Sequence, residues 1–371
     1  MQQERKQLLS GVKTVVLKLG TQLLGDAQGR LDVDYLSSVA NQVVELRQRG
    51  IAVTIVSSGA ISAGIAELRL PARPTDLAKL QAVAAVGQRR LMDGWAMAFA
   101  AHRLPVAQLL LTRQDIDDRP RFLNLRNTIH AVHELSAIPI INENDTVSTD
   151  EIVAISFGDN DILAAMVAHA LSAHLLVLMS VVDGLLDQNH KPVRTVQNVA
   201  EAAALVRDEK TTGGKGGMNS KLLAAKTVTD AGDTMAVVDG RMARVVLRLL
   251  DGEEVGTLFL PTARRRNSRD RWIGAARPVG SIFVDSGAAK ALIEKHRSLL
   301  PAGITSVDGE FQRGDVVAIR SADGTLIARG LSNYRAEQIQ AIRGKKTEEV
   351  RRLLHDAAYD EVVHCDNLVM E

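Results

Sequence analysis

The sequence predicts an α/β protein with a mostly parallel central sheet covered by helices on both faces. Short apolar runs alternate with longer helical patterns over residues 14 to about 250. The runs are apolar throughout rather than alternating, as expected for strands buried on both faces. They are Thr14–Leu19, Ile51–Val56, Val106–Leu111, Ile138–Ile141, Leu175–Met179 and Met235–Val238. Strand–helix alternation of this length is typical of parallel sheets.

The segments between these runs have helical periodicity. One apolar stripe runs from Leu36 to Val44 and ends before Gly50, and Asp76 to His102 forms a long alanine-rich pattern. Asn160 to Ala170 and Asn219 to Ala231 are two further helical patterns. Apolar residues three or four apart place one face of each helix against the sheet.

Small or polar residues follow every predicted strand. The residues at these exits are Gly20-Thr21, Ser57-Ser58-Gly59-Ala60, Thr112-Arg113, Asn142-Glu143-Asn144-Asp145, Ser180, and Asp239-Gly240. The carboxyl ends of parallel strands lie along one edge of an open sheet, and ligands bind there. The sequence therefore predicts a binding site at this edge.

The pattern changes after about Asp251. Thr257–Leu260 is consistent with one more strand, and residues 264–271 hold five arginines against one aspartate, as in a linker or an exposed edge. After Gly280, short β-type runs are separated by turn pairs such as Asp308-Gly309. We expect a first domain over 1–262, a linker over 263–279, a small mostly β domain over 280–358 and a tail over 359–371. The small domain should contain a helix near Ala288–Lys295, and a charged helical segment after Tyr334 should precede a last strand near Glu361–Val363.

Composition excludes several classes of protein. The formal net charge of the 371 residues is +1, which implies no general attraction to nucleic acid or membrane. The single cysteine, Cys365, rules out an intramolecular disulfide. No apolar run approaches the roughly 18 residues of a membrane-spanning helix, and the N-terminus lacks a signal-peptide pattern. We expect a cytoplasmic protein.

A glycine-rich stretch, Thr211 to Lys221, is the first candidate for ligand binding. Its glycines leave backbone N–H groups accessible just before a helix begins, and Lys215 and Lys221 add positive charge. Such a loop is suited to phosphate, although a plain surface loop is the alternative, and the spacing is not that of a Walker A motif.

Lys18 ends an otherwise apolar strand, where it either meets an anion or extends to water. With Lys221 it would suit the charge of a transferring phosphoryl group.

Two clusters of Asn and Asp residues flank one segment. They are Asn142-Glu143-Asn144-Asp145 and Gly158-Asp159-Asn160-Asp161. Residues of these types often only form turns, but the second cluster opens a helix, where one carboxylate can cap while another orients lysines.

His130, His133, His169 and His174 lack a third ligand at metal-site spacing, so hydrogen-bonded or solvent-facing histidines are favoured. A structural role is favoured for Cys365.

These motifs, taken in order, resemble the glutamate 5-kinase family. The segments that carry the resemblance are Val16–Thr21, Val56–Ala60, Ala84-Ala85-Val86-Gly87-Gln88, Leu110–Arg113, Pro139–Asp145, Gly158–Asp161 and Gly216–Lys221. The resemblance implies the amino acid kinase fold, a three-layer αβα sandwich, and a C-terminal β-barrel-like PUA domain that includes Ser298–Ile304. It also implies ATP-dependent phosphorylation of the L-glutamate γ-carboxylate, the first step of proline biosynthesis, with feedback inhibition by proline and assembly into a homo-oligomer, either a dimer or a tetramer.

The same resemblance assigns roles to individual residues. Lys18 and Lys221 would act on the transferring phosphoryl group, and Asp161 would orient them. Ser58, Asp145 and Asn160 would bind glutamate. The implied ATP-binding residues are Lys18, Gly20, Ser180, Val181, Gly216, Gly217, Met218, Asn219, Ser220 and Lys221. Mg²⁺ would be bound through the nucleotide, with no protein ligand of its own.

Two positions depart from the family pattern. Ser180-Val181 stands where the family commonly has Thr-Asp, and Lys215 stands where it commonly has Thr. We expect altered nucleotide affinity rather than lost activity, with partial compensation by Asp183. Alternative functions are a kinase for N-acetylglutamate or carbamate, and a nucleotide-regulated protein that binds RNA through the PUA-like domain.

Overall fold

The computed structural model describes residues 2–26, 30–147, 160–188, 191–203, 217–262, 268–354 and 359–370, and it divides into two compact units, 1–266 and 267–371. Eight strands form the sheet of the first unit in the order β3-β4-β2-β1-β5-β9-β10-β8. Their bounds are β1 Thr14–Leu19, β2 Ala52–Ser57, β3 Val106–Leu111, β4 Ile138–Glu143, β5 Leu175–Ser180, β8 Thr195–Val196, β9 Thr234–Asp239 and β10 Thr257–Phe259. The predicted strands are confirmed.

The sheet is parallel except between β9 and β10. Strand β10 confirms the predicted strand at 257–260, and it runs antiparallel, with Thr257 opposite Val237. A short second sheet pairs β6 (Leu185–Leu186) with β7 (Pro192–Val193). The prediction of a mostly parallel central sheet is therefore confirmed.

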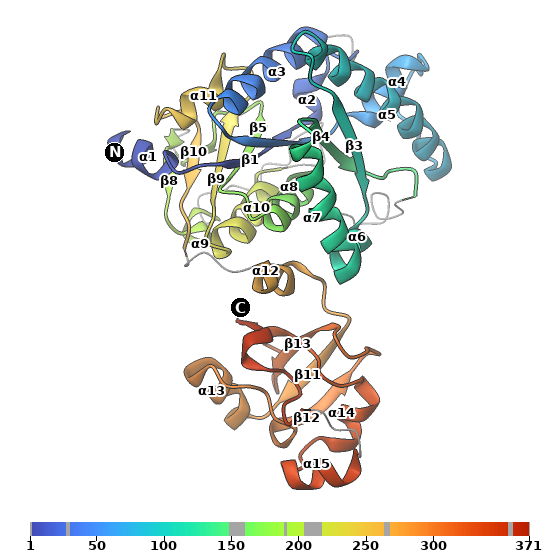
Figure 1. Ribbon diagram of the computed structural model, residues 1–371, viewed down its shortest axis with the longest axis vertical. Helices are drawn as coiled ribbons and strands as arrows, with labels where there is room; N and C mark the ends of the chain where they lie inside the picture. Colours follow the sequence, from blue (N-terminus) through green and yellow to red (C-terminus); the bar gives the residue numbers. More distant parts are fainter. Residues whose placement is uncertain are drawn as a thin grey trace. The chain divides into compact units, whose positions relative to one another are not determined.

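Helices cover both faces of the large sheet (Figure 1). On one face lie α3 (Val33–Gln48) and α11 (Val245–Leu250), and on the other lie α7 (Arg119–Glu134), α8 (Asn160–Leu171) and α10 (Met218–Asp230). The long helix α5 (Leu77–Ala100) packs on α3 and on α4 (Ala60–Glu67). The remaining helices are α1 Gln2–Leu9, α2 Thr21–Leu24, α6 Arg113–Asp117 and α9 Val199–Ala203.

Local sequence explains where the long helices begin. Asp32 caps α3 by accepting a hydrogen bond from the backbone of Tyr35, and Asp76 caps α5 by accepting one from the backbone of Lys79. The core is aliphatic, as the 3% aromatic content predicts. Residues of β1, β2 and β5, such as Leu17, Ile55 and Val177, are fully buried in it. None of the helices in the described ranges combines the length and apolarity needed to cross a membrane.

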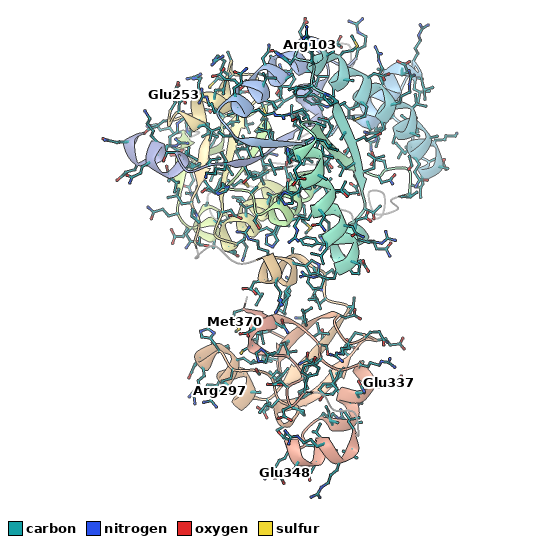
Figure 2. The ribbon with its side chains drawn as sticks, in the orientation of Figure 1. Arg103, Glu253, Arg297, Glu337, Glu348 and Met370 are labelled. Carbon is teal, nitrogen blue, oxygen red and sulfur yellow. The ribbon has the colours of Figure 1, made fainter. Side chains whose placement is uncertain are left out.

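The second unit has its own five-stranded sheet, in the order β12-β11-β13-β14-β15. The strands are β11 Gly280–Val284, β12 Ile304–Asp308, β13 Val316–Ser321, β14 Leu326–Leu331 and β15 Leu368–Met370, and the helices are α12 Ser268–Ala275, α13 Ser286–Lys295, α14 Ala336–Ile342 and α15 Thr347–Leu353. Charged side chains such as Arg297, Glu337 and Glu348 lie on the outside of this unit (Figure 2).

Two predictions for the C-terminal region are wrong. Residues 361–363 form no strand; Val363 makes only an isolated bridge to Leu299, and the last strand is β15. Arg271 is not exposed but fully buried, because α12 packs against β14 and β15 and buries Trp272 beside it. Arg329 Nη1 on β14 donates to Gly274 O at 2.7 Å, which attaches α12 to this sheet.

Candidate active site

One buried carboxylate holds two lysines at the carboxyl edge of the large sheet. Lys18 Nζ lies 2.6 Å from Asp161 Oδ1, and Lys221 Nζ lies 3.0 Å from Asp161 Oδ2. Asp161 has no exposed surface, and the lysines are 5% and 6% exposed. Because three groups from β1, α8 and α10 meet here, the carboxyl edge brings together residues more than 200 positions apart.

The electrostatics of this cluster favour an anionic ligand. Burial alone would raise the pKa of Asp161, but the charges of Lys18 and then Lys221 outweigh burial and lower the pKa to about 2. Two ammonium groups facing one carboxylate leave an excess of one positive charge among nearly buried groups. Both oxygens of Asp161 are already paired with ammonium groups, so the trio is poorly suited to bind a cation. Phosphate oxygens, in contrast, can accept hydrogen bonds from the two ammonium groups.

Glycines bring backbone close to the lysines. Gly20 N donates to Met179 O at 3.3 Å, and a Cβ at Gly20 would lie 3.9 Å from Lys18 Nζ. Gly217 is the N-cap of α10 and offers no side-chain cap, while Ser220 Oγ donates to Gly217 O and lies 3.2 Å from Asp161 Oδ2. The first turn of α10 therefore combines a positive dipole end with Lys221. Of the implied ATP-binding residues, Met218 and Asn219 lie in this turn, whereas Gly216 lies outside the described residues. Lys215, which departs from the family pattern, also lies outside them.

A second polar group lies at the exits of β2 and β4. Asn160 Nδ2 donates to Ser58 Oγ at 2.6 Å and to Asn142 Oδ1 at 3.0 Å. Asn142 Nδ2 in turn donates a hydrogen bond to Gln88 Oε1 on α5. Asp145 follows β4 in a turn and is partly buried. Asn160 and Asp161 are adjacent on α8, so this polar group is next to the lysine pair. Analysis of the sequence did not single out Gln88 as a site residue.

After β5, Asp183 bonds to neighbouring segments of the chain. Ser180 is partly buried opposite Asp239, and the Val181 side chain is 40% exposed. Asp183 Oδ1 accepts from Gly256 N at 3.0 Å, and its Oδ2 accepts from Arg194 Nη1 at 2.9 Å. Both Asp183 oxygens thus join the loop after β5 to neighbouring segments, which leaves the proposed compensation for the missing Asp without support.

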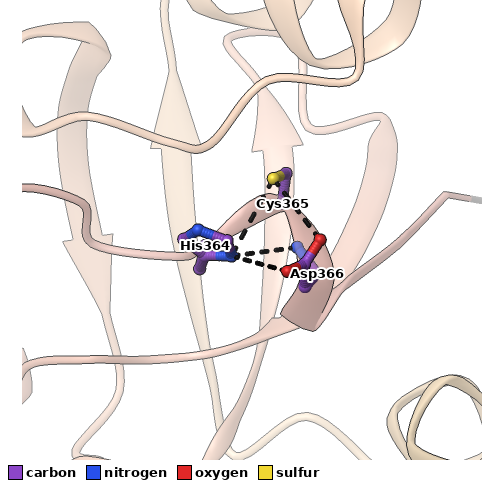
Figure 3. A group of neighbouring side chains, drawn as sticks. All are labelled: His364, Cys365 and Asp366. Carbon is purple, nitrogen blue, oxygen red and sulfur yellow. Dashed lines mark hydrogen bonds and ion pairs between the residues drawn. The ribbon is translucent and has the colours of Figure 1, made fainter.

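His133 and His174 bond to threonine side chains, and Cys365 lies in a turn with His364 and Asp366. His133 Nε2 lies 2.9 Å from Thr54 Oγ1, and His174 Nδ1 lies 2.6 Å from Thr14 Oγ1, so both rings are hydrogen-bonded as predicted. In the second unit, ligand atoms of His364, Cys365 and Asp366 lie within 4.8 Å of one another (Figure 3). These residues are consecutive, and Asp366 N donates to His364 Nδ1, so a turn cap explains their proximity.

The parallel sheet with helices on both faces, and the two lysines on one carboxylate at its carboxyl edge, define an amino acid kinase. The model of the Amino acid kinase family matches residues 13–239, and that of the PUA domain matches residues 280–354. The chain is 43% identical to glutamate 5-kinase of Geobacter sp. (strain M21) over 99% of its length and 100% of the relative. It is 44% identical to glutamate 5-kinase of Herpetosiphon aurantiacus over 96% of its length and 97% of the relative. The chain therefore belongs to the glutamate 5-kinase family.

Among solved structures, carbamate kinase from Giardia lamblia bound to AMP-PNP matches with a TM-score of 0.48 and 18% identity. The match covers 68% of this chain and 99% of that structure.

Proposed function

We propose that the chain transfers the γ-phosphoryl group of ATP to the γ-carboxylate of L-glutamate and forms L-glutamyl 5-phosphate. This is the first step of proline biosynthesis from glutamate. The observation that carries the proposal is the trio of Lys18, Asp161 and Lys221, whose excess positive charge is nearly buried. The full-length similarity to glutamate 5-kinases supports the choice of glutamate as the acceptor.

The chemistry needs little from the protein besides position and charge. Glutamate's side-chain carboxylate is ionised at neutral pH and is itself the nucleophile, so no general base is required. Phosphoryl transfer spreads negative charge over the oxygens of the moving group, and two preorganised ammonium groups stabilise that charge. Asp161 holds both lysines in place through the two ion pairs.

We assign glutamate and ATP to different parts of the sheet edge. Ser58, Asp145 and Asn160 bind glutamate, next to Asp161 on α8. ATP lies along Gly20, Ser180, Val181 and the segment Gly216–Lys221, with its phosphates at Lys18 and Lys221. Mg²⁺ would be held by the nucleotide phosphates, whose negative charge it would reduce. The one carboxylate of the trio is already paired with two ammonium groups, so it is not assigned to the ion.

Feedback inhibition by proline and assembly into a homo-oligomer, which the family implies, remain predictions. Cytoplasmic location, which the composition suggests, is also a prediction. RNA binding by the PUA domain is an alternative role for the second unit, and the net charge of +1 gives it no general support.

A hydroxamate assay tests the proposed function. The protein is incubated with ATP, Mg²⁺ and hydroxylamine, which traps the acyl phosphate, and L-glutamate, N-acetylglutamate and carbamate are compared as acceptors. We expect trapped product with glutamate far above N-acetylglutamate, and with carbamate no ADP release above background. Product with N-acetylglutamate alone would move the proposal to another carboxylate kinase. No product with any acceptor, together with a salt-sensitive shift of RNA, would favour the RNA-binding alternative.

A further inference from the structure

Gln88 ends a network of side-chain amides that begins at the proposed glutamate site. Asn160 Nδ2 donates to Ser58 Oγ and to Asn142 Oδ1, and Asn142 Nδ2 donates to Gln88 Oε1 at 2.8 Å. We call Ser58, Asn160, Asn142 and Gln88 the amide network. Asn142 and Gln88 are 3% and 8% exposed, so these bonds are shielded from water and each amide constrains the next.

The backbone around Gln88 is held by an unusually close helix crossing. A Cβ at Gly87 would lie 1.8 Å from Ala60 O, and one at Gly64 would lie 2.0 Å from Val83 O, so α4 and α5 touch backbone to backbone. Further along α5, Trp95 Nε1 donates to Ser57 Oγ at 3.0 Å. Helix α5 therefore reaches the β2 exit through Trp95 and the β4 exit through Gln88, and it cannot shift without losing both contacts.

The direction of the amide network decides what Asn160 offers a ligand. Its Nδ2 has two hydrogens, and both are used on Ser58 and Asn142. A ligand that meets this amide therefore meets its carbonyl oxygen, which attracts an ammonium group and repels a carboxylate. If every amide in the network turned over, Asn160 would offer a donor instead. The direction depends on Gln88 as an acceptor, since its Oε1 takes the last hydrogen bond.

Among the residues that the structure describes, only the oxygen of the Gln88 amide has a hydrogen-bond partner. Gln88 Nε2 is buried and has no hydrogen-bond partner among the described residues. A buried donor without a partner is destabilising, so this position is not optimised for a donor. An acceptor alone is what the neighbouring Asn142 requires.

We propose that Gln88 is a positioning residue that fixes the direction of the amide network, so that Asn160 presents its carbonyl oxygen to the α-ammonium group of an amino-acid substrate. This inference rests on the proposed function and deepens it. Gln88 does not touch the substrate. It selects, through Asn142 and Asn160, acceptors with a free ammonium group over dicarboxylates of the same length that lack one.

The test compares Gln88→Met with Gln88→Glu in the hydroxamate assay. A methionine at position 88 keeps the length of the side chain and removes the acceptor. A glutamic acid side chain at the same position keeps an acceptor oxygen in either protonation state. For Gln88→Met we expect the glutamate KM to rise about tenfold, as for the loss of one well-placed hydrogen bond, with kcat and the ATP KM nearly unchanged. The inhibition constant of glutarate, which lacks the ammonium group, should not change. In Gln88→Glu, the KM for the substrate glutamate should stay close to that of the wild type.

Gln48→Met is the matched control, because Gln48 is an exposed glutamine at the end of α3. An unchanged glutamate KM in Gln88→Met would overturn the inference. So would an equal loss in Gln88→Glu, since the network would then run in the other direction. Equal losses for glutamate, ATP and glutarate, or a lower melting temperature that explains them, would indicate a structural role. A wild-type protein that forms no glutamyl hydroxamate would instead overturn the proposed function on which the inference rests.

Discussion

Lys18 Nζ lies 2.6 Å from Asp161 Oδ1, and the second oxygen of the same carboxylate holds Lys221. A single buried charge therefore sets the positions of two opposite charges that come from distant parts of the sequence. Attraction to Asp161 offsets part of the cost of desolvating the lysines, and a phosphoryl group would supply the remaining negative charge. The arrangement has consequences for catalysis, for stability and for pH dependence.

Removal of either ammonium group should lower turnover without unfolding the protein. We expect Lys18→Met and Lys221→Met each to reduce kcat about 100- to 1000-fold, because each lysine stabilises charge that develops in the transition state. Initial rates of hydroxamate formation at saturating ATP and glutamate measure this. Lys226→Met is the matched control on the same helix, since the Lys226 side chain is 61% exposed and pairs with Asp230. A variant at Lys18 or Lys221 with nearly normal kcat would remove that lysine from the mechanism.

Neutralising Asp161 should destabilise the fold as well as the site. Asp161→Asn leaves two nearly buried ammonium groups without their counter-charge, and loss of one partner of a buried pair costs about 3–5 kcal/mol. Urea unfolding at pH 7 gives the difference in the free energy of unfolding. Asp230→Asn, which breaks an exposed ion pair on α10, should cost less than about 1 kcal/mol. Equal effects of the two substitutions would contradict the electrostatic account.

The depressed pKa of Asp161 predicts where acid destabilises the protein through this group. Its pKa is about 2 in the folded protein, below the ordinary value of 3.8. The folded state therefore holds its proton less tightly than the unfolded state. The stability contributed by Asp161 is complete above about pH 4 and is lost as pH falls towards 2. In urea titrations over this window, wild type should lose stability more steeply than Asp161→Asn, and equal slopes would contradict the assignment.

His133 predicts a second acid-sensitive window. Burial, and then the charges of Arg47 and His130, lower the pKa of His133 from 6.5 to about 4. The folded state disfavours the proton that the unfolded state accepts, so stability is complete above about pH 6.5 and falls as pH drops towards 4. His133→Gln, which can still bond Thr54, should flatten the dependence of melting temperature on pH in this range. A dependence that the substitution leaves unchanged would show that other groups cause it.

The crossing of α4 and α5 should tolerate no side chain at Gly87. An added Cβ would lie 1.8 Å from Ala60 O and 2.3 Å from Gly64 N, so Gly87→Ala must force the helices apart. We expect a loss of about 3 kcal/mol, at the upper end for overpacking, and a higher glutamate KM because Gln88 moves with the helix. Gly11→Ala is the control, since a Cβ there meets nothing within 4 Å. Chemical unfolding of both variants measures the difference, and a Gly87→Ala as stable as the control would be inconsistent with the close contact.

The parts of the fold that the sequence predicted are those with one dominant local signal. The run Leu175–Met179 is apolar throughout, and β5 is accordingly buried in the middle of the sheet. In contrast, the direction of β10 depends on its pairing with β9, about which a three-residue strand carries no information. Arg271 was misread because the charge of the arginine-rich stretch outweighed Trp272, whose burial depends on contacts with β14 and β15.

The candidate site shows the same division. Lys18, Asp161 and Lys221 were recognisable because each is charged at a strand exit or a helix start, where topology brings such residues to one edge. Gln88 lies in the middle of an alanine-rich helix, where a buried glutamine and an exposed one look alike in sequence. Its inward position follows from the contact between Gly87 and Ala60, which is set by tertiary packing.

The central claim is that Lys18 and Lys221 act together on the migrating phosphoryl group. Its most direct test is a crystal structure of the wild-type protein with Mg²⁺, L-glutamate and a non-hydrolysable ATP analogue, in which the distances from both Nζ atoms to the oxygens of the γ-phosphoryl group are measured. We predict that both ammonium groups lie within hydrogen-bond distance of those oxygens while Asp161 remains between them. A γ-phosphoryl group that meets neither lysine, or a glutamate carboxylate on the far side of the sheet edge, would contradict the account.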